Sequence, residues 1–246
     1  MLEAALWGFV GASALIVAAE LAFGIHFSRR VVGLIMAFGV GALISSVAFE
    51  LMVPALQSAP GWQVALSAAG GSLVFFLGDR AIAKAGGSGR KNPDREDDEG
   101  EDKDDGLGIV LGTALDGIPE SAVLGMSLVG GGGVSTALLA GIWVSNFPES
   151  LGSTVNLLKS GWKKGRIRLL WWGMALVSAA AAAIGFVVVN NSDTLTGALV
   201  SAFAAGALLT MIADEMAPEA FKRSQIYAGL ATTAGFVFAM WLTSLE

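Results

Sequence analysis

The stretch AFGVGALISSVAFELMVPA, residues 37–55, recurs in altered form as AFAAGALLTMIADEMAPEA, residues 202–220. The two stretches align without gaps at an offset of 165 residues and are identical at eight positions. Small residues coincide easily by composition alone. The shared acids Glu50 and Glu215, however, lie within apolar sequence, where a carboxylate is costly and therefore uncommon. We interpret the two stretches as an internal repeat.

The composition around these stretches indicates a membrane protein. The chain has 246 residues, of which 54% are hydrophobic and 15% charged, and its mean hydropathy is +0.66. A soluble domain contains about 25% charged residues. Nine of the 21 acids fall within residues 94–105, so the net charge of −6 mainly describes one segment. We therefore expect an all-α integral membrane protein.

Apolar runs long enough to cross a bilayer, about 20 residues each, occur eight times. They are residues 4–25, 31–56, 62–84, 106–129, 134–158, 166–190, 194–221 and 225–244. All 15 Lys and Arg residues lie in the loops after the first, third, fifth and seventh runs, or in the helix ends beside them. Because basic loops stay in the cytoplasm, this pattern predicts eight transmembrane helices with both termini extracytoplasmic.

This topology gives the repeated stretches opposite directions across the membrane, which is typical of inverted-repeat transporters. Residues 85–105 are rich in glycine and acids and lack aromatic residues. We predict a disordered, acidic cytoplasmic loop there, acting as a solvated linker or as a weak collector of cations.

Some chemistry is excluded by residues that the chain lacks. There is no cysteine, and His26 is the only histidine. Disulfides, thiolate ligands, a multi-histidine metal site and a Ser-His-Asp triad are therefore ruled out within one chain. No phosphate-binding loop is present, and the basic loops follow from topology, so we expect no nucleic-acid partner.

Away from the basic helix ends, the charged residues within the predicted spans are all acidic: Glu20, Glu50, Asp116, Glu120, Glu149, Asp214, Glu215 and Glu219. Ionisable groups at such depth indicate functional sites. We expect no Lys or Arg deep enough to pair with them, so that protons or cations must neutralise the carboxylates.

Two of the spans contain Pro-Glu-Ser. On the fourth, Asp116 and Glu120 are four residues apart and share a helix face; on the fifth, Ser145 and Asn146 share a face with Glu149. The proline before each glutamate also frees a carbonyl oxygen one turn earlier. This arrangement favours an oxygen-lined cation site. The alternative is that the prolines bend helices for packing and the acids are protonated.

The paired motifs DGIPES (116–121) and SNFPES (145–150) resemble the metal-binding core of the Zrt/Irt-like protein (ZIP) family of divalent-metal transporters. The long loop after the third span and the seventh-span stretch fit as well, so the resemblance covers essentially the whole chain. In that family the fourth helix typically reads H-N-x-P-E-G, and the fifth has a His/Gln-Asp/Glu-x-x-Glu pattern. The resemblance implies one transporter domain over residues 1–246, with its helices in a 3+2+3 inverted-repeat arrangement.

The resemblance further implies that Glu120 and Glu149 bridge the metal. Asp116 then replaces the usual fourth-helix histidine, and Ser145 and Asn146 take the two fifth-helix positions before the glutamate. Both usual histidines are absent, and the sixth span, residues 166–190, has no acid to complete a second metal position.

Oxygen ligands suit magnesium, calcium and manganese, whereas imidazole suits zinc, copper, iron and nickel. The ligand set therefore favours an ion harder than zinc, or weaker zinc binding, although zinc also accepts carboxylates. We expect import of zinc, manganese, iron or a similar ion across the cell membrane. Glu50 would serve the route from outside, and Asp214 and Glu215 the exit. Alternatively, some of these three acids meet water or headgroups at the interface.

The expected partners are the metal ion and the lipid bilayer, with a homodimer as one compatible assembly. Two other functions stay open: a proton-coupled transporter of a non-metal substrate, and a ZIP-like relative that does not transport. We expect no enzyme, because serine hydrolysis lacks a histidine base. Aspartyl hydrolysis would need Asp116 and Asp214 to face each other.

Overall fold

The computed structural model describes residues 1–84, 105–129 and 133–246, which form helices and no strands. The predicted loop at 85–105 lies outside the described residues, except for Asp105. That residue already begins a helix, so the helical segment starts one residue earlier than predicted. An all-helical fold is therefore confirmed for the described chain.

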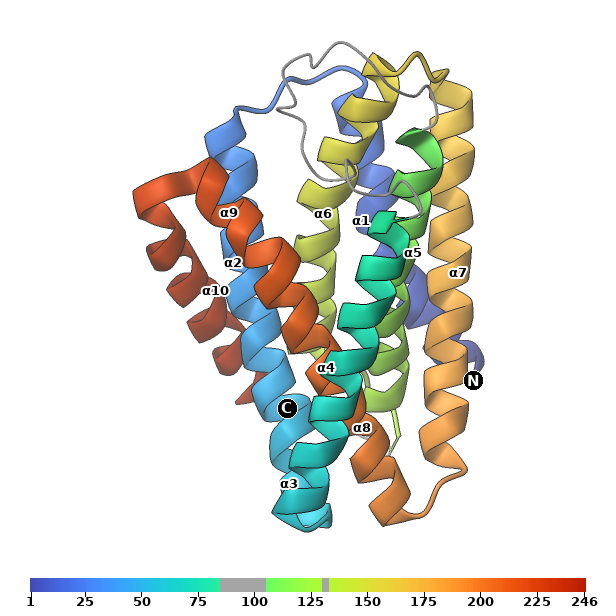
Figure 1. Cartoon of the computed structure of the whole chain (residues 1–246), viewed down its shortest axis with the longest axis vertical. Helices are drawn as coiled ribbons and strands as arrows, with labels where there is room; N and C mark the ends of the chain where they lie inside the picture. Colours follow the sequence, from blue (N-terminus) through green and yellow to red (C-terminus); the bar gives the residue numbers. More distant parts are fainter. Residues whose placement is uncertain (85–104, 130–132) are drawn as a thin grey trace.

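Each predicted span coincides with a helical segment (Figure 1). The single helices are α1 (Leu2–Ala22), α4 (Gly61–Lys84), α5 (Asp105–Ser127), α6 (Thr136–Lys159), α7 (Lys164–Asn190) and α10 (Ala228–Thr243). Two segments are composite. The first joins α2 (Arg29–Ser46), η1 (Val47–Met52) and α3 (Val53–Ser58); the second joins α8 (Thr194–Met211), η3 (Ile212–Met216) and α9 (Ala217–Ser224). A short 3₁₀ turn, η4 (Gln225–Tyr227), leads into α10.

Side-chain caps define where several of these helices begin. Ser28 accepts a hydrogen bond from the Val31 amide at the start of α2, and Ser135 accepts one from Leu138 at the start of α6. Asp193 accepts one from the Thr196 amide at the start of α8, at 2.7 Å. That hydrogen bond lowers the pKa of the Asp193 carboxyl. The caps satisfy backbone donors that the first helical turn leaves without partners.

Five segments are long and apolar enough to cross a membrane by length and composition. They are Leu2–Ala22, Arg29–Ser58, Gly61–Ile82, Lys164–Asn190 and Thr194–Thr243. Large apolar side chains also cover outward faces, as at Leu66, Leu176 and Leu230, which are 65%, 62% and 71% exposed. Such a surface is compatible with lipid contact. The segments and the surface together support an integral membrane protein.

The ends of the bundle separate the loops as the charge pattern predicts. The connections after α1, α6 and η3–α9 lie toward one end, at the top of Figure 1, whereas the α3–α4 and α7–α8 connections lie at the other. Both termini lie in the lower half of that view (Figure 1). Basic residues of the described loops thus gather toward a single end of the bundle.

Glycines bring two helix pairs into close backbone contact. A Cβ at Gly41 of α2 would overlap the carbonyl oxygen of Thr232 in α10, and one at Gly206 of α8 would overlap that of Ala68 in α4. Gly41 and Gly206 are equivalent positions of the sequence repeat. The contact is reciprocal in both pairs, because Gly235 of α10 abuts Phe38 and Gly71 of α4 abuts Phe203. Phe38 and Phe203 are also equivalent positions of the repeat.

The repeat is visible again where each composite segment changes its winding. The π-helical turns η1 and η3 both begin at the same repeat position, Val47 and Ile212, and each is followed by a helix with proline in its first turn. Proline cannot donate the amide hydrogen bond of a regular helix. A local π turn accommodates the resulting change in register and is frequent at functional sites. Glu50 and Glu215 lie within these turns.

Candidate functional site

The two Pro-Glu-Ser motifs lie on neighbouring helices, α5 and α6, each of which continues through its proline. Asp116 and Glu120 of α5 are both only 3% exposed. Glu149 of α6 is half-buried. Burying a carboxylate is costly unless other groups compensate its charge, so the environment of these acids decides what this part of the bundle can do.

One contact joins the predicted ligands of the two helices. The Ser145 hydroxyl of α6 lies 3.3 Å from Oε1 of Glu120 on α5. The same hydroxyl lies 2.9 Å from the carbonyl oxygen of Ile142, and its single proton serves one acceptor at a time. Ser145 and Glu120 are therefore neighbours across the interface of the two helices.

Asn146 is also buried, but its amide is turned toward α1. Its Nδ2 donates to the carbonyl oxygen of Gly11 at 3.4 Å, and one turn later Ser150 donates to the carbonyl of Leu15 at 2.5 Å. These contacts tie α6 to α1. Asn146 thus has a helix-packing contact that its predicted ligand role did not include.

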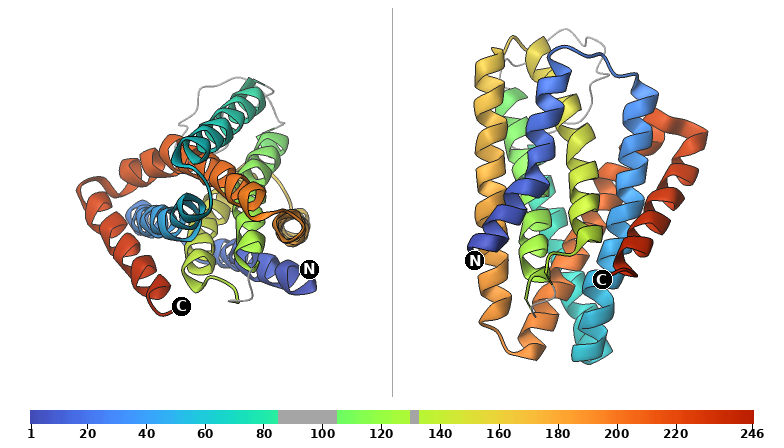
Figure 2. Two further views of the ribbon diagram at one scale, coloured as in Figure 1. Left: turned by 90° about the horizontal axis from the view of Figure 1, so that it is seen from below. Right: turned by 180° about the vertical axis from the view of Figure 1, so that it is seen from behind.

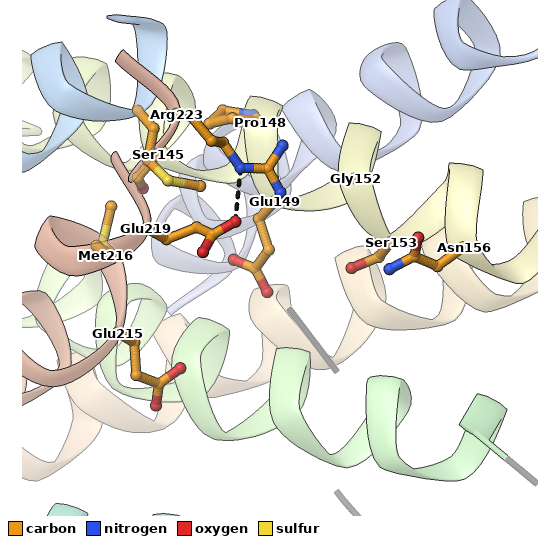
Figure 3. A pocket seen from close by; sticks show the side chains of 11 residues that line it. Ser145, Pro148, Glu149, Gly152, Ser153, Asn156, Glu215, Met216, Glu219 and Arg223 are labelled. Atoms are coloured by element: carbon orange, nitrogen blue, oxygen red, sulfur yellow. Dashed lines mark hydrogen bonds and ion pairs between the residues drawn. The ribbon is translucent and has the colours of Figure 1, made fainter. Parts of the chain in front are cut away.

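A cavity of about 40 Å³ lies between α2, α6 and the η3–α9 segment. That volume suffices for one to three waters or an ion of similar size. The oxygen-bearing side chains that line it are Ser145, Glu149, Ser153, Asn156, Glu215 and Glu219. Figure 3 shows the carboxylates of Glu149 and Glu219, from different helices, directed into the same space. Asp116, Glu120 and Asn146 do not line this cavity.

The cavity also contains a basic residue, contrary to expectation. Nε of Arg223 lies 2.6 Å from Oε1 of Glu219, and the two side chains are only 7% and 15% exposed. The prediction that no Lys or Arg reaches the buried acids is therefore wrong. Arg223 follows the end of an apolar run in the sequence and is therefore predicted in a loop, whereas α9 extends to Ser224 and packs against α2, which buries Arg223.

A second acid was also thought to be without a basic partner. Glu20, near the end of α1, forms an ion pair with Arg168 of α7, with Oε1 and Nε 2.5 Å apart. Both side chains are about half exposed, so this pair lies at the periphery of the bundle. Glu20 therefore does not belong to the acidic cavity.

The three acids assigned to the pathway occupy different environments. Glu50 lines a separate cavity of about 520 Å³ near α3 and the α7–α8 connection, and Thr243 donates to Glu50 at 2.7 Å. Glu215 lines the smaller cavity beside Glu149. Asp214 is exposed and lines neither of the two. The smaller cavity is lined in part by α9 and the larger one in part by α3, and these two helices lie toward opposite ends of the bundle (Figures 1 and 2).

The cavity adds residues that were not predicted as ligands, chiefly Asn156 and Glu219. Helical spacing carried the signal for both. Asn156 stands seven residues after Glu149, and Glu219 stands four after Glu215, so each pair shares a helix face. Both residues could have been found by following the helix faces of Glu149 and Glu215 along the sequence.

Within the described part of the chain, no three Asp, Glu, His or Cys side chains come together closely enough to hold a metal ion. Ser145 nevertheless links the two groups of acids: it adjoins Glu120 and also lines the cavity that contains Glu149 and Glu215. Neither the models of known protein families nor the curated proteins compared with this chain match it.

Proposed function

We propose that this protein carries a divalent metal cation across the membrane, with a fold like that of the ZIP transporters and eight transmembrane helices. The ion passes between α5 and α6, and the buried acids Asp116, Glu120 and Glu149 replace part of its hydration shell. Carboxylates are the preferred ligands for hard divalent ions. The ligand set therefore favours an ion harder than zinc, such as manganese, with iron and zinc as the other candidates.

The observation that carries this proposal is the continuity of oxygen ligands from α5 to α9. Ser145 adjoins Glu120 on one side and lines the cavity on the other, where Glu149, Glu215 and Glu219 supply further carboxylates. Glu50 lies in the cavity toward the opposite end. Acidic side chains thus line cavities toward both ends of the bundle, which supports a route of alternating access between them.

Metal uptake into proteoliposomes tests the function. Vesicles with a trapped metal-sensitive dye would be exposed to Mn²⁺, Zn²⁺, Fe²⁺ or Co²⁺. We expect the wild-type protein to give flux that stops when a chelator is added outside. Glu120→Gln and Glu149→Gln should each lower the initial rate at least tenfold, because each removes one charge from the ligand set.

The matched control is Glu3→Gln, which removes one charge from an exposed position at the start of α1. It should transport as the wild type does. Wild-type flux from both glutamine variants would refute the assigned site. Flux that follows a pH gradient and is unaffected by the chelator would instead identify a proton-coupled transporter of a non-metal substrate. The absence of flux under any gradient would identify a non-transporting relative.

A further inference from the structure

A basic cavity of about 620 Å³ lies beside the acidic one, where α2 begins and α9 ends. Arg29 and Arg30 contribute from α2, and Lys222 and Arg223 from α9. Of the described residues that line this cavity, none is acidic. On α9, one turn before Arg223, Glu219 forms an ion pair with it.

The basic side chains are held on a rigid frame. A Cβ at Gly33 of α2 would meet Arg223 and Ser224 of α9 at 2.5–2.9 Å, so these two helix ends touch at the backbone. The guanidinium of Arg30 stacks over the ring of Tyr227, 4.3 Å from its centroid. These contacts reduce the entropy that flexible side chains lose when they bind an anion.

The first turn of α2 adds to the positive potential, because its amides and helix dipole favour anions. Arginine guanidinium groups match phosphate oxygens in geometry, and lysine adds a point charge. The backbone at Gln225, on the rim of the cavity, has φ 51°, a conformation that costs energy for a residue other than glycine. The cavity thus combines four basic side chains with a volume large enough for a phosphate group.

Apolar side chains lie directly beside the cavity. Phe221, Ile226 and Leu230 are 64%, 81% and 71% exposed, on α9 and at the start of α10. Figure 1 shows this corner at the same end of the bundle as the described basic loops. In a bilayer, that end of an apolar helix meets the headgroups, while the exposed apolar side chains beside it meet acyl chains.

We propose that this cavity binds the phosphate of an anionic phospholipid, with the acyl chains lying against Phe221, Ile226 and Leu230. Basic pockets between transmembrane helices bind lipid headgroups in this way. Arg223 lines both this cavity and the acidic one. The bound lipid phosphate therefore lies close to the ion pair that Arg223 forms with Glu219.

The test is a lipid titration of the purified full-length protein in a neutral detergent, followed by native mass spectrometry. The probes are dioleoyl phosphatidylglycerol, dioleoyl phosphatidylcholine and inorganic phosphate. We expect phosphatidylglycerol to bind more tightly than phosphatidylcholine. The double variant Arg30→Gln/Lys222→Gln should weaken phosphatidylglycerol binding about fivefold for each basic residue removed.

The matched control is Lys163→Gln/Arg166→Gln, which removes two charges from the exposed α6–α7 connection and the start of α7. It should change the affinity less than twofold. If both double variants lost affinity for phosphatidylglycerol equally, the effect would come from general surface charge, and the proposal would be overturned. Inorganic phosphate that competes fully at millimolar concentration would overturn the lipid assignment in favour of a phosphate-ion site.

The melting temperature of each variant in phosphatidylcholine shows whether it is folded. If the double variant does not fold, the single variant Lys222→Gln carries the test, because this side chain is exposed. It should still weaken phosphatidylglycerol binding about fivefold. Unchanged affinity in a folded Lys222→Gln protein would contradict the proposal.

Discussion

At the residue scale, the ion pair between Glu219 and Arg223 changes the electrostatics of the acidic cavity. The carboxylates of Glu149, Glu215 and Glu219 line one small cavity, and Arg223 is the basic residue among the side chains that line it. Like charges in such proximity raise one another's energy unless protons or cations bind. The Arg223 guanidinium therefore acts as a counterion within the cavity, and under the proposed function a cation would compete with it.

We predict that Arg223→Gln lowers stability and makes it depend on metal. Removing one partner of a buried ion pair costs about 3–5 kcal/mol, because the other charge is left buried. Thermal unfolding of the purified protein with and without Mn²⁺ measures the effect. Mn²⁺ should raise the melting temperature of Arg223→Gln more than that of the wild type.

The double variant Glu219→Gln/Arg223→Gln is the control for this prediction, since it removes both charges and keeps two polar side chains. Its stability without metal should recover toward that of the wild type. An Mn²⁺ shift in Arg223→Gln no larger than the wild-type shift would show that the guanidinium does not compete with a cation.

At the scale of the helix, the internal repeat has a packing consequence. Gly41 and Gly206 are equivalent by sequence, and both allow a neighbouring helix to approach to backbone contact. Small residues at such positions permit close packing within a membrane, where apolar burial gives little driving force between helices. The α2–α10 and α4–α8 pairs are therefore two copies of the same interface.

We predict that Gly41→Ala and Gly206→Ala destabilise the protein by similar amounts, about 1–3 kcal/mol each, because the added methyl group overlaps a backbone carbonyl oxygen. Melting temperature in detergent measures this. Gly173→Ala is the matched control: its added Cβ meets nothing within 4 Å. That variant should be neutral or slightly stabilised, since alanine is the better helix former. Equal effects of all three substitutions would contradict the packing argument.

At the scale of the whole molecule, the arrangement of loops gives a direct test of topology. The described connections that carry basic residues lie toward one end of the bundle, and those after α3 and α7 toward the other (Figure 1). A membrane that crosses the bundle between these ends places them in different compartments. The absence of cysteine makes the chain a ready background for thiol labelling.

We predict that Lys163→Cys is labelled from the cytoplasmic side only, and Asn191→Cys from the other side only. Both residues are exposed and lie at opposite ends of α7. A membrane-impermeant maleimide applied to intact cells and to inverted vesicles measures this. Gln225→Cys should be labelled from the same side as Lys163→Cys, because it lies in another connection that carries basic residues. Labelling of the first two from the same side would contradict the eight-helix topology.

The sequence by itself determined the helical segments and the repeat, because both depend on local patterns. Apolar runs of about 20 residues specify the segments, and the Glu50–Glu215 match pairs two of them. These features follow from helix periodicity, which the sequence displays directly.

Only the tertiary structure decided which acids share a cavity and which have basic partners. Glu149, Glu215, Glu219 and Arg223 come from segments separated by more than 60 residues, and nothing in their spacing fixes how α6 and α9 face each other. The turn of Asn146 toward α1 depends likewise on helix packing. Burial and pairing of charges depend on three-dimensional distance, because Coulomb and desolvation energies follow the separation of atoms and the solvent around them.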